Sequence, residues 1–62
     1  MTLEDQVWEE VCRRQNYFSA KQLCRAVGCS YSYAKMLLGQ YVVKGIVEMR
    51  QRDKTKLYRI PK

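Results

Sequence analysis

Residues 30–45 constrain the fold most, because they combine a helical start signal, a helical stop signal and two distinct faces. Ser30 is a typical helix N-cap, and Gly45 following Lys44 is typical of a left-handed C-cap. At about 100° per residue, one face gathers the apolar side chains expected in the core, namely Ala34, Leu37, Leu38, Tyr41 and Val42. The sequence therefore predicts one amphipathic helix over about residues 31–44.

The opposite face of this helix lacks the glutamates and lysines that usually keep an exposed helix soluble. It carries hydroxyls, an amide, a thioether, a glycine and one lysine, in the outward and flanking residues Ser32, Tyr33, Lys35, Met36, Gly39, Gln40 and Val43. A glycine in mid-helix costs roughly 1 kcal/mol relative to alanine, so Gly39 indicates close approach of another molecule. We expect this face to be covered by a partner.

A shorter helix is predicted just before the long one. Ser19 and Gln22 have the spacing of a capping box, and Gly28 is a natural left-handed end, which places the helix at about residues 20–27. Its buried side is expected to hold Leu23, Cys24, Ala26 and Val27. The turn that follows is so short that the two helices must cross steeply.

The N-terminal segment predicts a further helix over about residues 3–15. Thr2 and Asp5 resemble a capping box, and the acidic first turn suits the positive end of the helix dipole. An apolar stripe is expected from Leu3, Val7, Trp8, Val11 and Cys12. This helix should stop near Gln15 or Asn16.

After Gly45 the hydrophobic period changes from 3.6 to 2, which predicts strands. Residues 46–50 and 55–60 read as two short strands around a polar turn at 51–54. Because an isolated hairpin is marginal, this one should pack on the helices through Val47, Met49, Tyr58 and Ile60. The expected fold is α+β, mainly α: one domain over residues 1–62 with three helices and a two-stranded hairpin at about 46–60.

The charge of the chain is polarised. Residues 1–10 contain four acids and no base, residues 11–47 contain six bases and no acid, and residues 48–62 contain six bases and two acids, for a net charge of +6. A basic face opposite an acidic pole is typical of a protein that binds a polyanion. A merely solubilising surface is the alternative.

The composition favours binding over catalysis. The chain has no histidine, three cysteines without CxxC spacing, no glycine-rich phosphate loop and no paired carboxylates in an apolar setting. We therefore expect no enzyme activity, no cofactor and no metal, and we interpret the cysteines as small apolar residues in a reducing compartment. With no apolar run able to span a bilayer and no targeting segment, the sequence predicts a cytoplasmic protein without a membrane partner.

The order of elements resembles the winged helix-turn-helix family over nearly the whole chain. The likeness is strongest at residues 30–47, where Ala34, Leu38 and Tyr41 precede a Lys-Gly-Ile-Val ending, and continues in a returning strand at 55–60. The small size is similar to bacterial fimbrial-operon regulators and small phage or plasmid regulators. Two positions depart from the family pattern: Gly39, and Tyr41 in place of an aliphatic residue.

The resemblance implies sequence-specific binding of double-stranded DNA by a small transcription regulator. Helix 31–44 would enter the major groove, and the basic hairpin would lie on the backbone or in the neighbouring minor groove. The candidate recognition-helix contacts are Ser30, Tyr31, Ser32, Tyr33, Lys35, Met36 and Gln40. The candidate hairpin contacts are Arg50, Arg52, Lys54 and Lys56, and Lys21 is a candidate for a backbone contact.

The side chains agree with this chemistry. Gln40 suits an adenine edge, Met36 a thymine methyl group, and Lys35 a phosphate or guanine. A single module buries only about 600–1,000 Å² on DNA, so we expect a homodimer or a partner regulator.

Each assignment has a structural alternative. Tyr31 and Tyr33 could pack on neighbouring elements, Met36 and Val43 could form a protein interface, and the basic hairpin tip could guard an edge strand. The rival functions are a winged-helix protein-interaction or assembly module, an accessory protein of phage or plasmid excision and recombination, and binding of structured RNA.

Overall fold

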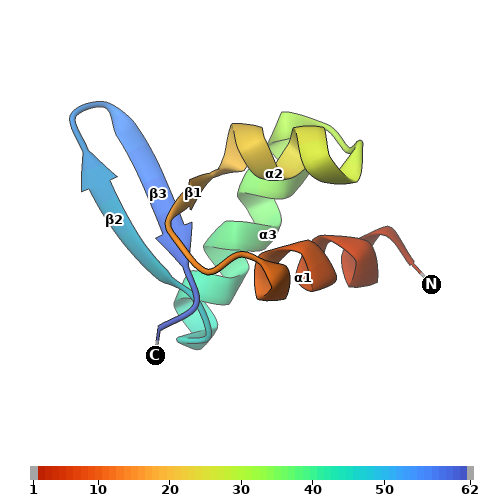
Figure 1. The fold of residues 1–62 in the computed structure, drawn as a ribbon, viewed down its shortest axis with the longest axis horizontal. Helices are drawn as coiled ribbons and strands as arrows, with labels where there is room; N and C mark the ends of the chain where they lie inside the picture. The colour runs from red at the N-terminus through yellow and green to blue at the C-terminus, as the bar shows by residue number, and fades with distance from the viewer. Residues whose placement is uncertain (1, 62) are drawn as a thin grey trace.

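The structure is a computed structural model, and it describes residues 2–61. The helices of this range are α1 (Leu3–Arg13), α2 (Ala20–Val27) and α3 (Tyr31–Lys44), and its strands are β1 (Phe18–Ser19), β2 (Glu48–Arg52) and β3 (Thr55–Arg59). The three helices pack together, and the β2–β3 hairpin projects from their side (Figure 1). The predicted α+β, mainly helical class is confirmed.

The sheet has a third strand that the sequence did not predict. It is antiparallel with the order β1-β3-β2, and β1 joins it by pairing Phe18 with Tyr58 and Ser19 with Leu57. A strand of two residues is too short to show a period of 2, so periodicity could not reveal it. The prediction of a two-stranded hairpin was therefore incomplete, because the chain between α1 and α2 adds an edge strand.

The β2–β3 hairpin, called the wing from here on, starts later and turns more tightly than predicted. Its pairs run from Glu48 with Arg59 to Arg52 with Thr55, so only two residues form the turn, and Asp53 there has φ of 55°. Aspartate tolerates this left-handed conformation. Strand β2 is delayed because the N–H of Ile46 donates to a carbonyl of α3, which keeps this residue in the helix cap.

The bounds of α2 and α3 agree with the prediction, whereas α1 ends two residues early. Arg14 leaves the helix with an extended backbone, and its Nε lies 3.2 Å from Glu10 Oε2. The guanidinium of Arg14 lies 5.7 Å from the centre of the Phe18 ring. These contacts turn the chain toward β1, so the expected continuation to about residue 15 was wrong.

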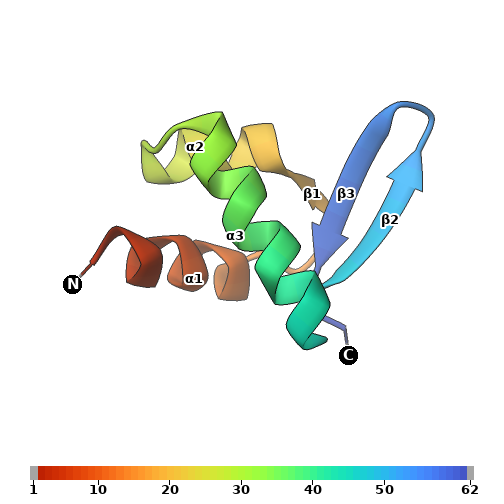
Figure 2. The ribbon, with the colours of Figure 1, turned by 180° about the vertical axis from the view of Figure 1, so that it is seen from behind.

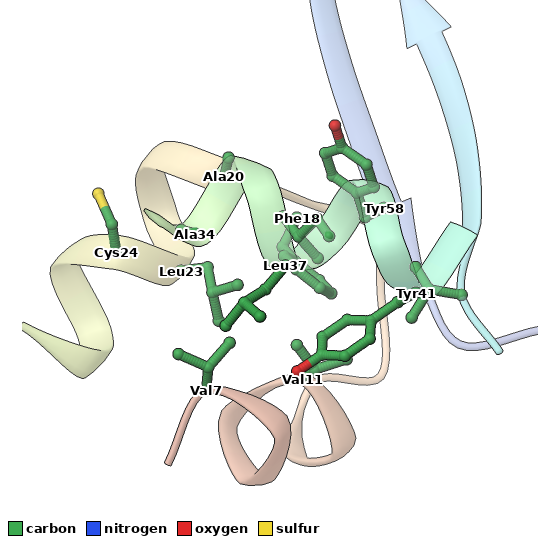
Figure 3. Close-up of a cluster of buried hydrophobic side chains, with 12 residues drawn as sticks. Val7, Val11, Phe18, Ala20, Leu23, Cys24, Ala34, Leu37, Tyr41 and Tyr58 are labelled. Atoms are coloured by element: carbon green, nitrogen blue, oxygen red, sulfur yellow. The ribbon is translucent and has the colours of Figure 1, made fainter. Parts of the chain in front are cut away.

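The core lies where the three helices meet the sheet. Val7 and Val11 of α1 point toward Leu23 of α2 and Leu37 of α3, as Figure 3 shows. The buried set is Val7, Val11, Phe18, Ala20, Leu23, Cys24, Ala34, Leu37, Leu38, Tyr41, Val47 and Tyr58. Trp8 closes one edge with its ring centre 5.1 Å from that of Tyr41, in an edge-to-face contact.

Some residues predicted to be buried are not. Leu3 is 42% exposed and Cys12 is exposed, because α1 buries only its Val7–Val11 side. Ala26 is exposed, and Ala20 takes the buried place on α2. Met49, on the edge strand β2, is 43% exposed. The predicted packing of Val47 and Tyr58 is confirmed, and Ile60 packs partly buried against the core.

Candidate nucleic-acid interface

The outward face of α3 is exposed in the structure, as the sequence predicted. Its exposed residues are Tyr31, Ser32, Lys35, Met36, Gly39, Gln40, Val43 and Lys44. Met36 is 50% exposed and Val43 is 86% exposed. Helix α3 lies in front of the other two helices in Figure 2.

Tyr33 behaves differently from the other candidates of α3. It is half-buried and packs against the core, which agrees with the structural alternative for this residue. Ser30 also has a structural task, because its Oγ accepts a hydrogen bond of 3.1 Å from the backbone N–H of Tyr33. These two residues support α3, whereas the exposed positions remain open to a ligand.

A groove of about 650 Å³ lies between α2, the start of α3 and the start of β3. Its cationic lining residues are Lys21, Arg25, Lys35, Lys54 and Lys56. The other lining residues are uncharged, and they are Ser19, Ala20, Cys24, Tyr31, Thr55 and Tyr58. We call this feature the basic groove. Because no acid lines it, it concentrates positive potential in a concave surface.

The residues that line the basic groove are spaced four apart on the two helices and two apart on the strand. Lys21 and Arg25 lie four residues apart on α2, and Tyr31 and Lys35 have the same relation on α3. Residues four apart are neighbours on one face of a helix. Lys56 and Tyr58 lie two apart on β3 and therefore share one face of the strand. The groove thus depends on the way three elements meet, which no single stretch of sequence encodes.

The wing divides its four basic candidates between two faces. Cross-strand partners share a face, so Lys56 lies on the side of its partner Gln51 and of the buried Tyr58. Arg50 and Arg52 alternate to the opposite side of β2. Only Lys54 and Lys56 reach the basic groove. The single basic tip expected from the sequence is therefore two separate surfaces.

The outer side of the wing carries a polar cluster that the sequence reading did not identify. The hydroxyl of Tyr17 donates to Glu48 Oε1 at 3.1 Å, and Nε of Arg59 donates to the same oxygen. These hydrogen bonds lower the pKa of Glu48 below its ordinary value of 4.5. The guanidinium groups of Arg59 and Arg50 lie 4.6 and 5.6 Å from the Tyr17 ring centre. The cluster joins the residue before β1 to the wing, and it forms because β3 pairs with both β1 and β2.

Four of the six acidic residues lie on α1, which is set apart from the wing in Figure 2, and the other two, Glu48 and Asp53, lie in the wing. Asp5 closes the capping box at the start of this helix, and Glu10 pairs with Arg13 and Arg14. The charge polarity of the sequence is thus also a polarity in space. The acidic end lies on α1, and the basic groove lies between α2, α3 and β3.

Among residues 2–61, no group of three or more histidine, cysteine, aspartate or glutamate side chains could hold a metal ion. Cys24 is buried, Cys29 is half-buried and Cys12 is exposed, and all three are free thiols. Burial raises the pKa of Cys29, which makes it a less reactive thiol.

None of the described helices is long and apolar enough to cross a membrane.

No family model and no curated protein matches the chain. Among solved structures, the chain is similar to part of human N-acetylserotonin methyltransferase in complex with SAM. The TM-score is 0.79 at 17% sequence identity, and the match covers 95% of this chain and 17% of the methyltransferase chain. At this identity the likeness concerns the fold alone. The same arrangement of helices and sheet therefore also occurs as a small part of a much larger enzyme.

Proposed function

We propose that this protein binds double-stranded DNA sequence-specifically, as a small regulator of transcription built on the winged helix-turn-helix plan. In this proposal α3 enters the major groove, and a DNA backbone runs along the basic groove. The lysines at the tip of the wing hold the phosphates of that backbone or of the adjoining minor groove. The protein acts by binding and not by catalysis.

The observation that carries the proposal is the convergence of five cations from α2, α3 and the wing on one concave surface beside α3. Single cations on a protein surface are usual, but a cluster without any acid repels itself unless an anion neutralises it. A chain of phosphates suits the groove because it offers one charge every few ångströms along its length. The side chains of Lys21 and Lys56 stand on different walls and would contact the same strand from two sides.

The exposed face of α3 supports the second half of the proposal. An α-helix fits the major groove of DNA, and α3 has a long exposed side. Its start adjoins the basic groove through Tyr31 and Lys35. A backbone held in the groove would therefore lie beside the base edges that α3 can reach.

A salt titration with charge-removing variants tests the proposal. Binding of a fluorescent mixed-sequence duplex would be measured by anisotropy between about 50 and 200 mM salt. Changing Lys21 and Lys56 together to glutamine is expected to reduce the slope of log K against log salt by about 2, because each lost phosphate contact removes about one counterion. Arg13→Gln is the matched control, since its side chain is 74% exposed on α1, and it should leave the slope unchanged.

The result also separates the rival functions. A protein-interaction module would show no salt-dependent DNA binding, and its Val43 variants would lose a protein partner instead. An RNA-binding protein would prefer structured RNA over the duplex under the same conditions. If the groove variants and Arg13→Gln bind the duplex equally, the groove does not hold the backbone and the proposal is wrong.

A further inference from the structure

The exposed face of α3 offers few groups that can read a guanine–cytosine pair. The preferred partner of guanine in the major groove is a bidentate arginine or lysine, and cytosine is read by a carboxylate. The described residues of α3 include no arginine, aspartate or glutamate. The lysine nearest its start, Lys35, lines the basic groove and so lies beside the proposed backbone.

The middle of that face is apolar. Met36 is 50% exposed, and Gly39 lies one turn later. Apart from the adjoining residues and the surrounding backbone of α3 itself, a β-carbon placed on Gly39 would meet no atom of the described chain within 4 Å. Internal packing therefore does not require this glycine, although it weakens the helix. A bare backbone at this position lets α3 come closer to whatever covers the face.

Major-groove chemistry indicates what this apolar centre fits. The C5-methyl group of thymine is the apolar group that base pairs present there. Covering a guanine–cytosine edge with the Met36 side chain would bury donors and acceptors without partners, which is unfavourable. Gln40, four residues after Met36 and therefore its neighbour on the helix surface, is suited to an adenine edge.

We infer that α3 selects A·T-rich sequences by placing Met36 against thymine methyl groups, with Gly39 allowing the close approach and Gln40 reading an adjacent adenine. This inference rests on the proposed function, and it specifies the DNA that the same site prefers. The discrimination comes from apolar contact and not from hydrogen bonds to guanine.

Thymine and deoxyuridine duplexes test the inference directly. A duplex selected by the protein from a random pool would be compared with the same duplex carrying deoxyuridine in place of thymine, which removes the methyl group and keeps the hydrogen-bonding edge. Burial of one methyl group corresponds to about a fourfold change in affinity. We expect the wild-type protein to bind the deoxyuridine duplex at least about fourfold more weakly.

Met36→Ala should bind both duplexes with equal affinity while keeping the wild-type salt dependence. Met49→Ala is the matched control, because this methionine is similarly exposed at 43% but lies on β2, and it should retain the wild-type preference. Thermal melts of both variants check that they remain folded.

The outcomes distinguish failure of this inference from failure of the proposed function. Selection of G·C-rich fragments, or equal wild-type affinity for thymine and deoxyuridine, would overturn the inference while leaving DNA binding intact. A preference that survives in Met36→Ala would also overturn it. Absence of binding to any duplex at low salt would refute the proposed function itself, and the inference with it.

Discussion

Replacing Gly39 by alanine is expected to stabilise the protein, although glycine substitutions often do harm. Gly39 lies within α3 and has no positive φ, unlike Gly28 at 85° and Gly45 at 78°. Open space surrounds the position that its β-carbon would take. The new methyl group therefore causes neither backbone strain nor a clash within the described chain.

The magnitude follows from helix propensity. Alanine is favoured over glycine in a helix interior by about 0.8–1.0 kcal/mol. The chief reason is that an unfolded chain with alanine at this position has fewer conformations to lose on folding than one with glycine. For a domain of this size, 1 kcal/mol raises Tm by about 4–8 °C. Gly45→Ala should act in the opposite direction, because the left-handed conformation costs a residue with a β-carbon about 1–2 kcal/mol. The Tm of Gly39→Ala should thus be higher than that of the wild type, and the Tm of Gly45→Ala should be lower.

Urea and thermal unfolding, followed by circular dichroism, would measure both changes. The same samples would be tested for duplex binding, where Gly39→Ala is expected to weaken affinity because its methyl group faces the proposed DNA. A variant that is more stable and binds less well would separate the two roles of this position. If Gly39→Ala lowers Tm, the helix-propensity argument is refuted, and if it binds DNA as well as the wild type, the close approach at Gly39 is refuted.

Three further outcomes are expected from unfolding experiments. Tyr41→Phe should be neutral or stabilising by up to about 1 kcal/mol, because the Tyr41 hydroxyl is buried without a hydrogen-bond partner in the described structure. Leu38→Ala should destabilise by about 2–5 kcal/mol, since Leu38 is 0% exposed. The lost stability would appear as a lower urea concentration at the midpoint of unfolding of this variant. The folded-state pKa of Glu48 is lowered, so its ionised form stabilises the protein above pH 4.5 and this stability is lost as the pH falls through the lowered pKa. Glu48→Gln should therefore flatten the dependence of Tm on pH below 4.5.

Local signals in the sequence located the helices well. Ser19 with Gln22 and Ser30 mark the starts of α2 and α3, and Gly28 and Gly45 mark their ends. Capping is a local interaction, because a side chain three residues away satisfies a free backbone group. The buried and exposed sides of α3 were predictable for a similar reason, since a regular helix converts sequence spacing directly into direction.

Strand pairing and helix ends near loops were less predictable. Strand β1 exists because Phe18 lies opposite Tyr58, forty residues away along the chain. The early end of α1 depends on the contacts of Arg14 with Glu10 and Phe18. Such contacts form only after distant segments meet, so they leave no periodic trace in the sequence.

The candidate interface also has one part that was predictable from the sequence and one part that was not. The sequence alone determined the outward face of α3, its unusual lack of acids and its mid-helix glycine, because these features belong to one regular element. Only the tertiary structure decided that Lys21, Lys35 and Lys56 line one groove and that Arg50 and Arg52 lie elsewhere. The physical reason is that strand register and helix crossing set which side chains from different elements face each other, and both are fixed by long-range packing.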